Sequence, residues 1–270
     1  MISSLGMYDF EEVRWATNAL WSAIACVLED EGFDDVPKGL ERARLGNDIW
    51  TANDLLIAQT CGYPLMTSLK GRCAYVATPC YGVEGCEGAN YSSVILARAG
   101  DGPQTLEDAR GLRAAVNGPD SMSGHIALKA AFAPYTKDES FFGSAIVTGR
   151  HTASMEAVRD GEGDVCAIDC VTYALAERYR SDLCKGLKKI GSSPAAPGLP
   201  LITSLTIEQG GEGGPNLERL RKALKTAYLS PETRDAREAL FITGLVNLNS
   251  NAYMRILEIE EMGSGLNILP

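Results

Sequence analysis

Short apolar runs rich in β-branched residues alternate along this chain with longer segments of helical periodicity. The first helical segment carries an apolar stripe at Phe10, Val13, Leu20, Trp21, Ile24 and Leu28, and Trp15 falls outside it. Strands are predicted over residues 2–5, 54–60, 72–79, 91–98, 112–117, 144–148 and 164–169. Helices are predicted over residues 105–110, from Ser121 onward, and over 153–161, 171–179, 217–229, 231–244 and 251–263. Alternation of this kind is typical of parallel βα units, so we expect an α/β fold with mostly parallel sheets flanked by helices.

Two extended stretches divide this pattern into two lobes. One begins after the Gly-rich segment CYGVEGCEGAN, and the other is the Pro/Ala-rich segment that ends in LPLITS. Only helices are expected after the second stretch, and they need a sheet to cover. We therefore expect lobe one over residues 1–92 plus 204–270, lobe two over residues 93–203, and two hinge crossings between them.

Composition and charge exclude several classes of protein. The 270 residues are 45% hydrophobic and 22% charged, and no apolar run reaches the roughly 18 residues of a membrane span. A net charge of −10 without a basic stripe argues against nucleic-acid binding. The first residues lack the basic and apolar regions of a secretory signal. Two interpretations stay open, namely a cytoplasmic protein and an exported protein whose leader was trimmed.

The cysteines and histidines give little support for a metal site. Eight cysteines include no C-x-x-C pair, and there are only two histidines, so we expect no metal and no cofactor. Cys61, Cys80 and Cys86 fall in loop-like sequence and are the candidates for pairing in an oxidising compartment.

Five junctions between a strand and a helix carry the polar side chains that could meet a ligand. In open parallel sheets, ligands bind outside the carboxyl ends of the strands. The side chains at these junctions are Tyr8, Gln59, Thr60, Tyr63, Ser121, Ser123, His151, Asp169 and Thr172.

The junction NGPDSMSG offers a site for an anion that needs no cation. The first N–H groups of a helix lack internal partners and carry partial positive charge, so they can hold a tetrahedral oxyanion. Gly124 permits close approach of the backbone, and Ser121 and Ser123 add neutral donors. The simpler interpretation is that Ser121 or Asp120 only caps the helix, and both interpretations stay open here.

The other junction residues have similar alternatives. His151 could be a solvent-exposed residue, and Asp169 could cap the next helix or accept from a ligand. Tyr8 and Tyr63 could be core or rim aromatic residues or donors to a ligand.

Several of these segments together resemble a known family. SLGMYD, LLIAQTCGYPL, CEGANYSSVILAR, AAVNGPDSMSGHIAL, TGRHTASMEAVRDGEGDVCAIDCVTYAL and APGLPLITS are similar to the phosphate, phosphite and phosphonate substrate-binding components of ABC transporters. The similarity runs over essentially the whole chain. It implies a two-lobed type 2 periplasmic-binding-protein fold that closes on its ligand by a hinge motion.

The resemblance also implies a role for individual residues. It places the phosphonyl oxygens at Ser121, Met122, Ser123 and Gly124, with His151 and Asp169 completing that lobe. Tyr8, Thr60 and Tyr63 would close the pocket from lobe one, and Tyr91 and Ser92 are further candidates. It implies a monomeric periplasmic binder of a small oxyanion, with an ABC permease as partner and no catalysis.

Three alternatives stay open on the sequence alone. Cys170 with His151 as base could make a cysteine-dependent enzyme, although the apolar residues around Cys170 favour packing. Tyr, Asp and His ligands could bind ferric ion, although the adjacent tyrosine pair expected of bacterial iron binders of this fold is missing. The same fold could also bind a sulfonate or a pyrimidine vitamin precursor.

Overall fold

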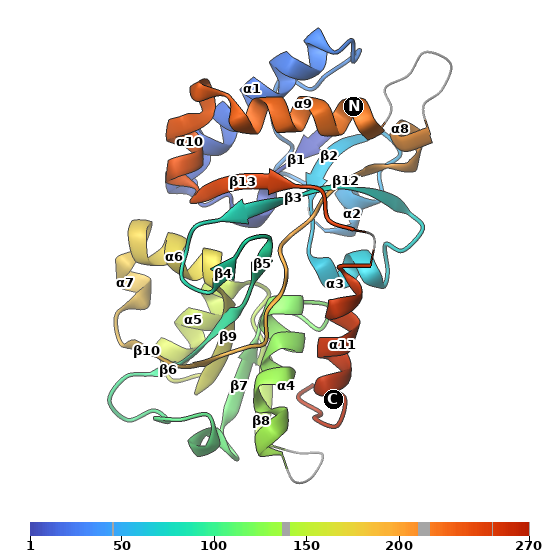
Figure 1. Cartoon of the computed structure of the whole chain (residues 1–270). Coiled ribbons are helices and arrows are strands. Elements are labelled where there is room, and N and C mark those ends of the chain that lie inside the picture. The colour runs from blue at the N-terminus through green and yellow to red at the C-terminus, as the bar shows by residue number, and fades with distance from the viewer. Residues whose placement is uncertain (45, 137–140, 210–216, 250, 270) are drawn as a thin grey trace. The chain divides into compact units, whose positions relative to one another are not determined.

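The chain folds into two compact units. The computed structural model describes residues 1–44, 46–136, 141–209, 217–249 and 251–269 (Figure 1). Unit 1 comprises Met1–Gly82 and Gly198–Ser250, and unit 2 comprises Val83–Pro197 and Asn251–Pro270. Each unit is formed from two separate segments of the chain, and the units divide at residues 82 and 197, whereas the expected lobes divide at residues 92 and 203.

Unit 1 is built on a five-stranded sheet in the order β1-β2-β12-β3-β13. Its strands are β1 (Ile2–Ser4), β2 (Leu55–Gln59), β3 (Cys73–Tyr81), β12 (Leu201–Ser204) and β13 (Ile242–Val246). Every residue of β2 and β12 is buried, which explains their continuous apolar character. Leu55, Ala58 and Ile202 pack there with Ile49 and Leu69 in one apolar cluster.

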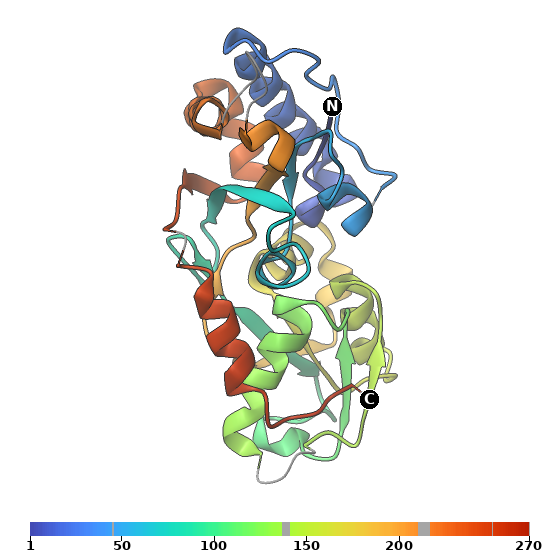
Figure 2. The same cartoon turned by 90° about the vertical axis from the view of Figure 1, so that its right-hand side faces the viewer.

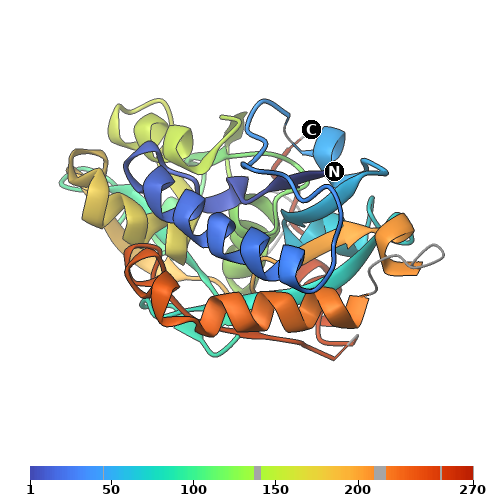
Figure 3. The same ribbon diagram turned by 90° about the horizontal axis from the view of Figure 1, so that it is seen from above.

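Helices cover this sheet because each buries one apolar stripe. The helical segments of unit 1 are η1 (Gly6–Tyr8), η2 (Glu11–Val13), α1 (Arg14–Asp30), α2 (Asn47–Trp50), α3 (Gly62–Met66), α8 (Leu205–Gln209), α9 (Leu217–Leu229), η6 (Pro231–Thr233) and α10 (Arg234–Ala239). Leu20, Trp21, Ile24 and Leu28 of α1 are buried, whereas Trp15 is 53% exposed, as its position outside the stripe predicts. Figure 3 shows α1 and α9 side by side.

Unit 2 has its own five-stranded sheet in the order β10-β6-β9-β7-β8, and a small sheet in the order β11-β5-β4. The strands are β4 (Cys86–Glu87), β5 (Asn90–Tyr91), β6 (Ser93–Arg98), β7 (Arg113–Val116), β8 (Ser144–Val147), β9 (Val165–Asp169), β10 (Leu187–Ser192) and β11 (Ala196–Pro197). All five residues of β9, which lies at the centre of the larger sheet, are buried.

The helices of unit 2 follow its strands and place their first residues at strand ends. They are η3 (Glu107–Ala109), η4 (Met122–Ile126), α4 (Ala127–Phe132), η5 (Ala133–Tyr135), α5 (His151–Arg159), α6 (Cys170–Tyr179), α7 (Ser181–Cys184) and α11 (Met254–Met262). The predicted helix over residues 105–110 is only a 3-10 turn over Glu107–Ala109. The core of the unit gathers Phe132, Phe141 and Phe142 around β6, β7 and β9.

Both sheets are mixed, so the expectation of mostly parallel sheets is wrong. Among the described strands of unit 1, only β1 and β2 pair in parallel, and β12 runs antiparallel to both β2 and β3. In unit 2, β7 is parallel to β8 and β9, whereas β6 is antiparallel to β9 and β10. Apolar runs mark a strand as buried, but they carry no information on its direction in the sheet.

The C-terminal part of the chain also differs from expectation. Residues 242–246 form β13, antiparallel to β3, although the helix predicted over residues 231–244 includes the first three of them. The β-branched Ile242, Thr243 and Val246 suit a strand. Helix α11 belongs to unit 2 rather than lobe one, because it packs on α4 and the following Leu266 and Ile268 enter the core of unit 2 (Figure 2).

Candidate functional site

The junction between β7 and η4 in unit 2 begins a helix with a neutral cap. Ser121 has extended backbone angles (φ −85°, ψ 120°), and its Oγ accepts a hydrogen bond from the Gly124 N–H at 3.0 Å. Its carbonyl accepts from the N–H groups of His125 and Ile126, which gives the first turn a wide, π-helical form. No acidic side chain stands in this turn. The cap predicted for Ser121 is therefore present and is neutral, and the carboxylate that lies nearest in sequence, Asp120, directly precedes the cap and is not in the turn.

Gly124 is required by its close approach to Asn117. A Cβ built on Gly124 would collide with Asn117 Oδ1 and lie 2.6 Å from Asn117 Cγ. Asn117 Oδ1 is itself buried and has no hydrogen-bond partner among the described residues. The glycine thus leaves room for the Asn117 side chain, which follows β7, against the first turn of η4, and any larger residue requires that this side chain or the turn shift.

Ser123 is joined to His151 across the sheet. The Ser123 Oγ and His151 Nε2 lie 2.8 Å apart, and Ser123 is 5% exposed. Burial lowers the pKa of His151 to about 4, and the backbone of Ala167 opposes that shift only in part. His151 is therefore neutral at pH 7 and presents one donor and one acceptor to its surroundings.

Asp169 caps a second helix of unit 2. Its Oδ1 accepts hydrogen bonds from the N–H groups of Val171 at 2.8 Å and Thr172 at 3.0 Å, at the start of α6. Asp169 is 1% exposed. Of the two roles considered for this carboxylate, the helix cap is present in the structure, and contact with a ligand stays a prediction.

A small recess brings Ser123 together with the start of β6. It has a volume of about 130 Å³ and is lined by uncharged residues, namely Tyr91, Ser92, Ser93, Met122, Ser123, Ala127, Ser193, Pro194 and Ala196. Ser93 pairs in register with Asp169 of β9, and its N–H donates to Ser193 Oγ at 2.8 Å. The two further candidates Tyr91 and Ser92 therefore share a recess with Met122 and Ser123.

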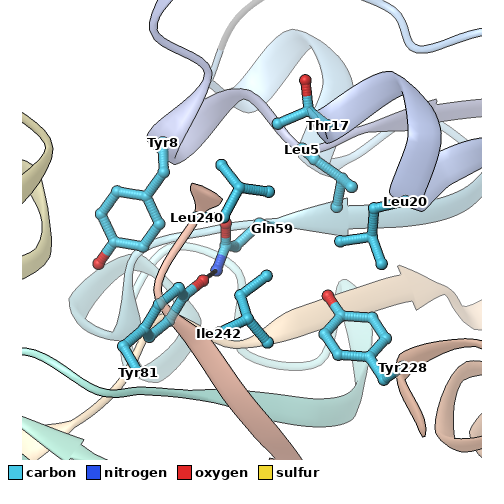
Figure 4. A pocket seen from close by; sticks show the side chains of 9 residues that line it. All are labelled: Leu5, Tyr8, Thr17, Leu20, Gln59, Tyr81, Tyr228, Leu240 and Ile242. Carbon is cyan, nitrogen blue, oxygen red and sulfur yellow. Dashed lines mark hydrogen bonds between the residues drawn. The ribbon is translucent and has the colours of Figure 1, made fainter. Parts of the chain in front are cut away.

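In unit 1, Tyr8 lines a pocket with mixed polar and apolar walls (Figure 4). The pocket has a volume of about 300 Å³ and is lined by Leu5, Tyr8, Thr17, Leu20, Gln59, Tyr81, Tyr228, Leu240 and Ile242. The rings of Tyr8 and Tyr81 meet edge to face with centroids 5.1 Å apart, and Gln59 Nε2 donates to the Tyr81 hydroxyl at 3.1 Å. Burial raises the pKa of Tyr228, which keeps its phenol protonated at neutral pH.

Thr60 and Tyr63 lie apart from that pocket lining. Thr60 follows β2 and is fully buried, and its hydroxyl has no hydrogen-bond partner in the part of the chain that the structure describes. Tyr63 lies in the short helix α3 and is half-buried. Of the lobe-one junction residues, Tyr8 and Gln59 therefore lie on the wall of this pocket, whereas Thr60 and Tyr63 are not part of its lining.

Two alternative chemistries find little support in these contacts. His151 Nε2 is bonded to Ser123, while the sulfur of Cys170 lies against Cys86, so the two groups of a thiol–imidazole pair have other partners. The hydrogen bond with Cys86, burial and the charge of Asp169 raise the pKa of the Cys170 thiol, which opposes its use as a nucleophile. Among the described residues, no three His, Cys, Asp or Glu side chains gather where they could hold a metal ion.

Several residues of these sites were not among the predicted ones. Asn117 and Ser93 stand at the end of β7 and the start of β6, and Tyr81 closes β3. Their position at strand termini was the available signal, but the sequence does not show which strand ends share an edge. Cys86, expected in loop sequence, meets Cys170, and Cys80 lies inside β3 rather than in a loop.

Known structures share the fold at low sequence identity. The binding-protein component of an ABC phosphonate transporter from Pseudomonas aeruginosa is 15% identical, with a TM-score of 0.71 over 97% of this chain and 85% of that one. PhnD1 from Prochlorococcus marinus, in complex with methylphosphonate, is 13% identical, with a TM-score of 0.70 over 98% and 97% of the two chains. A Xanthomonas citri protein bound to chloride ion is 13% identical, with a TM-score of 0.70 over 97% and 96%. The expected two-lobed type 2 periplasmic-binding-protein fold is thereby confirmed.

The family model confirms the resemblance seen in the sequence. No curated protein matches this chain significantly. However, the model described as ABC transporter, phosphonate, periplasmic substrate-binding protein matches residues 53–253, which is more than half of the chain. The protein therefore belongs to the family of periplasmic substrate-binding proteins of ABC phosphonate transporters.

Proposed function

We propose that this protein binds a phosphonate, or a closely related small tetrahedral oxyanion, at the first turn of η4 in unit 2. The observation that carries the proposal is the neutral cap that the Ser121 hydroxyl gives to that helix. Anions are stabilised at such helix ends by main-chain N–H groups and by the helix dipole. Membership of the phosphonate-binding family supports the same ligand class.

The groups around this turn fit a dianion without any formal positive charge. Ser121 and Ser123 can each donate a hydroxyl proton, and Met122 and Ser123 contribute main-chain N–H groups at the same turn, whereas the Gly124 N–H is engaged by the Ser121 cap. The neutral imidazole of His151 orients the Ser123 hydroxyl at 2.8 Å. In a buried site, hydrogen bonds to a charged oxygen are stronger than at an exposed surface, which offsets the loss of hydration of the ligand.

The remaining predicted contacts form part of the same proposal. Asp169 would accept from a protonated ligand oxygen or an ammonium group with the carboxylate oxygen that does not cap α6. Tyr8, Thr60 and Tyr63 are the candidate contacts from unit 1. The PhnD1 structure contains methylphosphonate and the Xanthomonas citri structure contains chloride, and both ligands are compatible with an anion site in this chain.

The biological role follows from the family. We infer a non-catalytic, periplasmic binding component that delivers its ligand to an ABC permease. His151 is hydrogen-bonded to Ser123 and not to Cys170, and the pKa of Cys170 is raised. Both observations support a protein without a cysteine-dependent reaction. No helix in the described part of the chain has the length and apolar character needed to cross a bilayer.

Titration calorimetry with methylphosphonate, phosphite, phosphate and sulfate tests this proposal. Gly124→Ala should lower affinity for the preferred ligand by at least about 100-fold, because its Cβ displaces the turn from Asn117. Ser123→Ala removes one donor to a charged oxygen and should lower affinity by roughly 10-fold or more. Gly265→Ala is the matched control, since it lies in unit 2 and a Cβ there meets nothing within 4 Å.

The outcome separates binding at η4 from binding elsewhere. Retention of wild-type affinity by a folded Gly124→Ala variant, as judged by circular dichroism, would place the ligand away from η4. Preference for sulfate over all three phosphorus oxyanions would overturn the ligand class while leaving the location intact.

A further inference from the structure

Two cysteines of unit 2 have their sulfur atoms in contact. Cys86 lies in β4 and Cys170 is the first residue of α6, and their Sγ atoms are 3.4 Å apart. Cys170 is 2% exposed and Cys86 is partly exposed. The two residues are 84 positions apart in the chain, so their contact is produced by the fold alone.

Backbone hydrogen bonds position both thiols. Cys86 pairs with Tyr91 across the β4–β5 hairpin, and the Cys170 N–H donates to the Ser92 carbonyl at 3.2 Å. The Ser92 N–H in turn donates to the Gly85 carbonyl at 2.8 Å, which connects the two sides of the contact.

Gly85 permits the close approach between the hairpin and the helix. It has a φ of +93°, and a Cβ there would lie 3.0 Å from the Cβ of Cys170. Because both cysteines are held by main-chain contacts, only a small movement of the side chains is needed to bring the sulfurs to bonding distance.

We propose that Cys86 and Cys170 form a disulfide bond in the oxidised protein. Two thiols are oxidised with loss of two protons and two electrons, and a protein or small-molecule disulfide is the oxidant that is reduced to two thiols. The Cys86 thiolate attacks the oxidant and forms a mixed disulfide with release of one thiol. The Cys170 sulfur then attacks Cys86 Sγ, releases the second thiol of the oxidant, and closes the bond.

The order of these steps follows from the surroundings of each sulfur. Cys86 is the more accessible of the two, so the oxidant can reach it. The contact with Cys86 is the largest cause of the raised pKa of Cys170, followed by burial and the neighbouring Asp169 charge, so Cys170 does not react first with an external oxidant. Once Cys86 is in the mixed disulfide, its thiol no longer raises the pKa of Cys170, and the Cys170 sulfur attacks a sulfur that already lies beside it. A periplasmic family is exposed to an oxidising compartment in which such a bond persists.

The bond would connect the hairpin to the helix that Asp169 caps. Asp169 precedes Cys170 directly, and its carboxylate accepts from the next two N–H groups of α6. We therefore expect the disulfide to stabilise the start of α6 against local opening and to raise the melting temperature of the protein by about 10 °C.

Peptide mapping of protein incubated with oxidised glutathione tests the proposal directly. Cleavage after glutamate and before aspartate releases Cys86 within residues 85–87 and Cys170 within residues 169–177, each as the sole cysteine of its peptide. The expected result is one cross-linked species that lacks about 2 Da relative to the two free peptides and separates upon reduction. Recovery of residues 85–87 only as free thiol, as a glutathione adduct, or linked to another cysteine would overturn the proposal.

A second measurement uses thermal unfolding with and without reductant. The wild type should lose about 10 °C upon reduction, whereas Cys86→Ser and Cys170→Ser should show no effect of reductant. Cys26→Ser, which changes an exposed thiol of α1, is the matched control and should keep the wild-type response. An unchanged response in Cys86→Ser would also contradict the proposal. Neither measurement involves ligand, so the result does not depend on the proposed phosphonate site.

Discussion

Two helices of unit 2 start directly after neighbouring strands of one sheet, yet their first turns are capped in opposite ways. The turn after β7 is capped by the hydroxyl of Ser121, whereas the turn after β9 is capped by the carboxylate of Asp169. A carboxylate at a helix N-terminus balances the partial positive charge of the free N–H groups, and a hydroxyl does not. The comparison supports our proposal that an external anion binds at η4, whereas α6 already has an internal carboxylate at its start.

A third junction lies between these extremes. Helix α5 begins at His151 without a side-chain cap, and the imidazole bonds to Ser123 of η4. Since the imidazole is neutral, it connects the two junctions without adding charge to either. The anion site that we propose therefore owes its polarity to main-chain dipoles.

Replacement of the neutral cap of η4 by a carboxylate should make its first turn like that of α6 and remove its attraction for an anion. Ser121→Asp keeps a good helix cap, so the protein should remain folded, but its carboxylate should repel the ligand and lower oxyanion affinity by about 100-fold or more. Ser121→Asn, which caps without charge, is the matched control and should lose far less. The two variants are compared by titration calorimetry with methylphosphonate. Equal affinities for Asp and Asn at this position would mean that the ligand does not meet the η4 end.

Removal of the charged cap of α6 should lower the stability of the protein more than removal of the neutral cap of η4. Asp169→Ala leaves the buried N–H groups of Val171 and Thr172 without an acceptor, so the free energy of unfolding should fall by about 2 kcal/mol. Asp169→Asn should recover most of this loss, because the amide oxygen still accepts. Urea denaturation measures the differences, with the exposed Asp160→Asn as control. If Asp169→Ala lost affinity but no stability, the capping role assigned to this carboxylate would be incorrect.

The histidine between the two junctions should make stability depend on pH. The folded pKa of His151 of about 4 lies below the usual value near 6.5, so the unfolded chain takes up the proton first. Its contribution is complete above pH 6.5 and is lost as the pH falls toward 4, at up to about 1.4 kcal/mol per pH unit. His151→Gln should flatten the fall of unfolding free energy between these pH values, as measured by urea denaturation. The control is His125→Gln, which should flatten it less, because burial lowers the pKa of His125 by a smaller amount.

The local part of the site could be predicted from the sequence. Ser121 and Asp169 were both expected as possible caps, because these residue types accept hydrogen bonds from N–H groups two or three positions later. The helical stripe of α1 and the exposure of Trp15 follow from the same short-range rules. These features depend on residues within a few positions of one another.

The contacts between distant residues could not be predicted. The Ser123–His151 bond joins residues 28 positions apart, and the Cys86–Cys170 contact joins residues 84 positions apart. A side chain at position 124 would collide with Asn117, which lies beside the turn in the folded protein. The sequence shows that position 124 is a glycine, but it does not show which residue lies beside it. Each of these contacts requires that the order of strands in the sheet be known.

The amino-acid sequence alone determined the apolar stripe of α1, the buried runs that form most strands, the capping residues and the family resemblance, because periodicity and local motifs are properties of neighbouring residues. Tertiary structure alone decided the direction of the strands, the place of α11 in unit 2, and which strand ends meet. The physical reason is that a buried apolar strand has the same composition in either direction, so only its pairing with β-strands far away in the chain selects one.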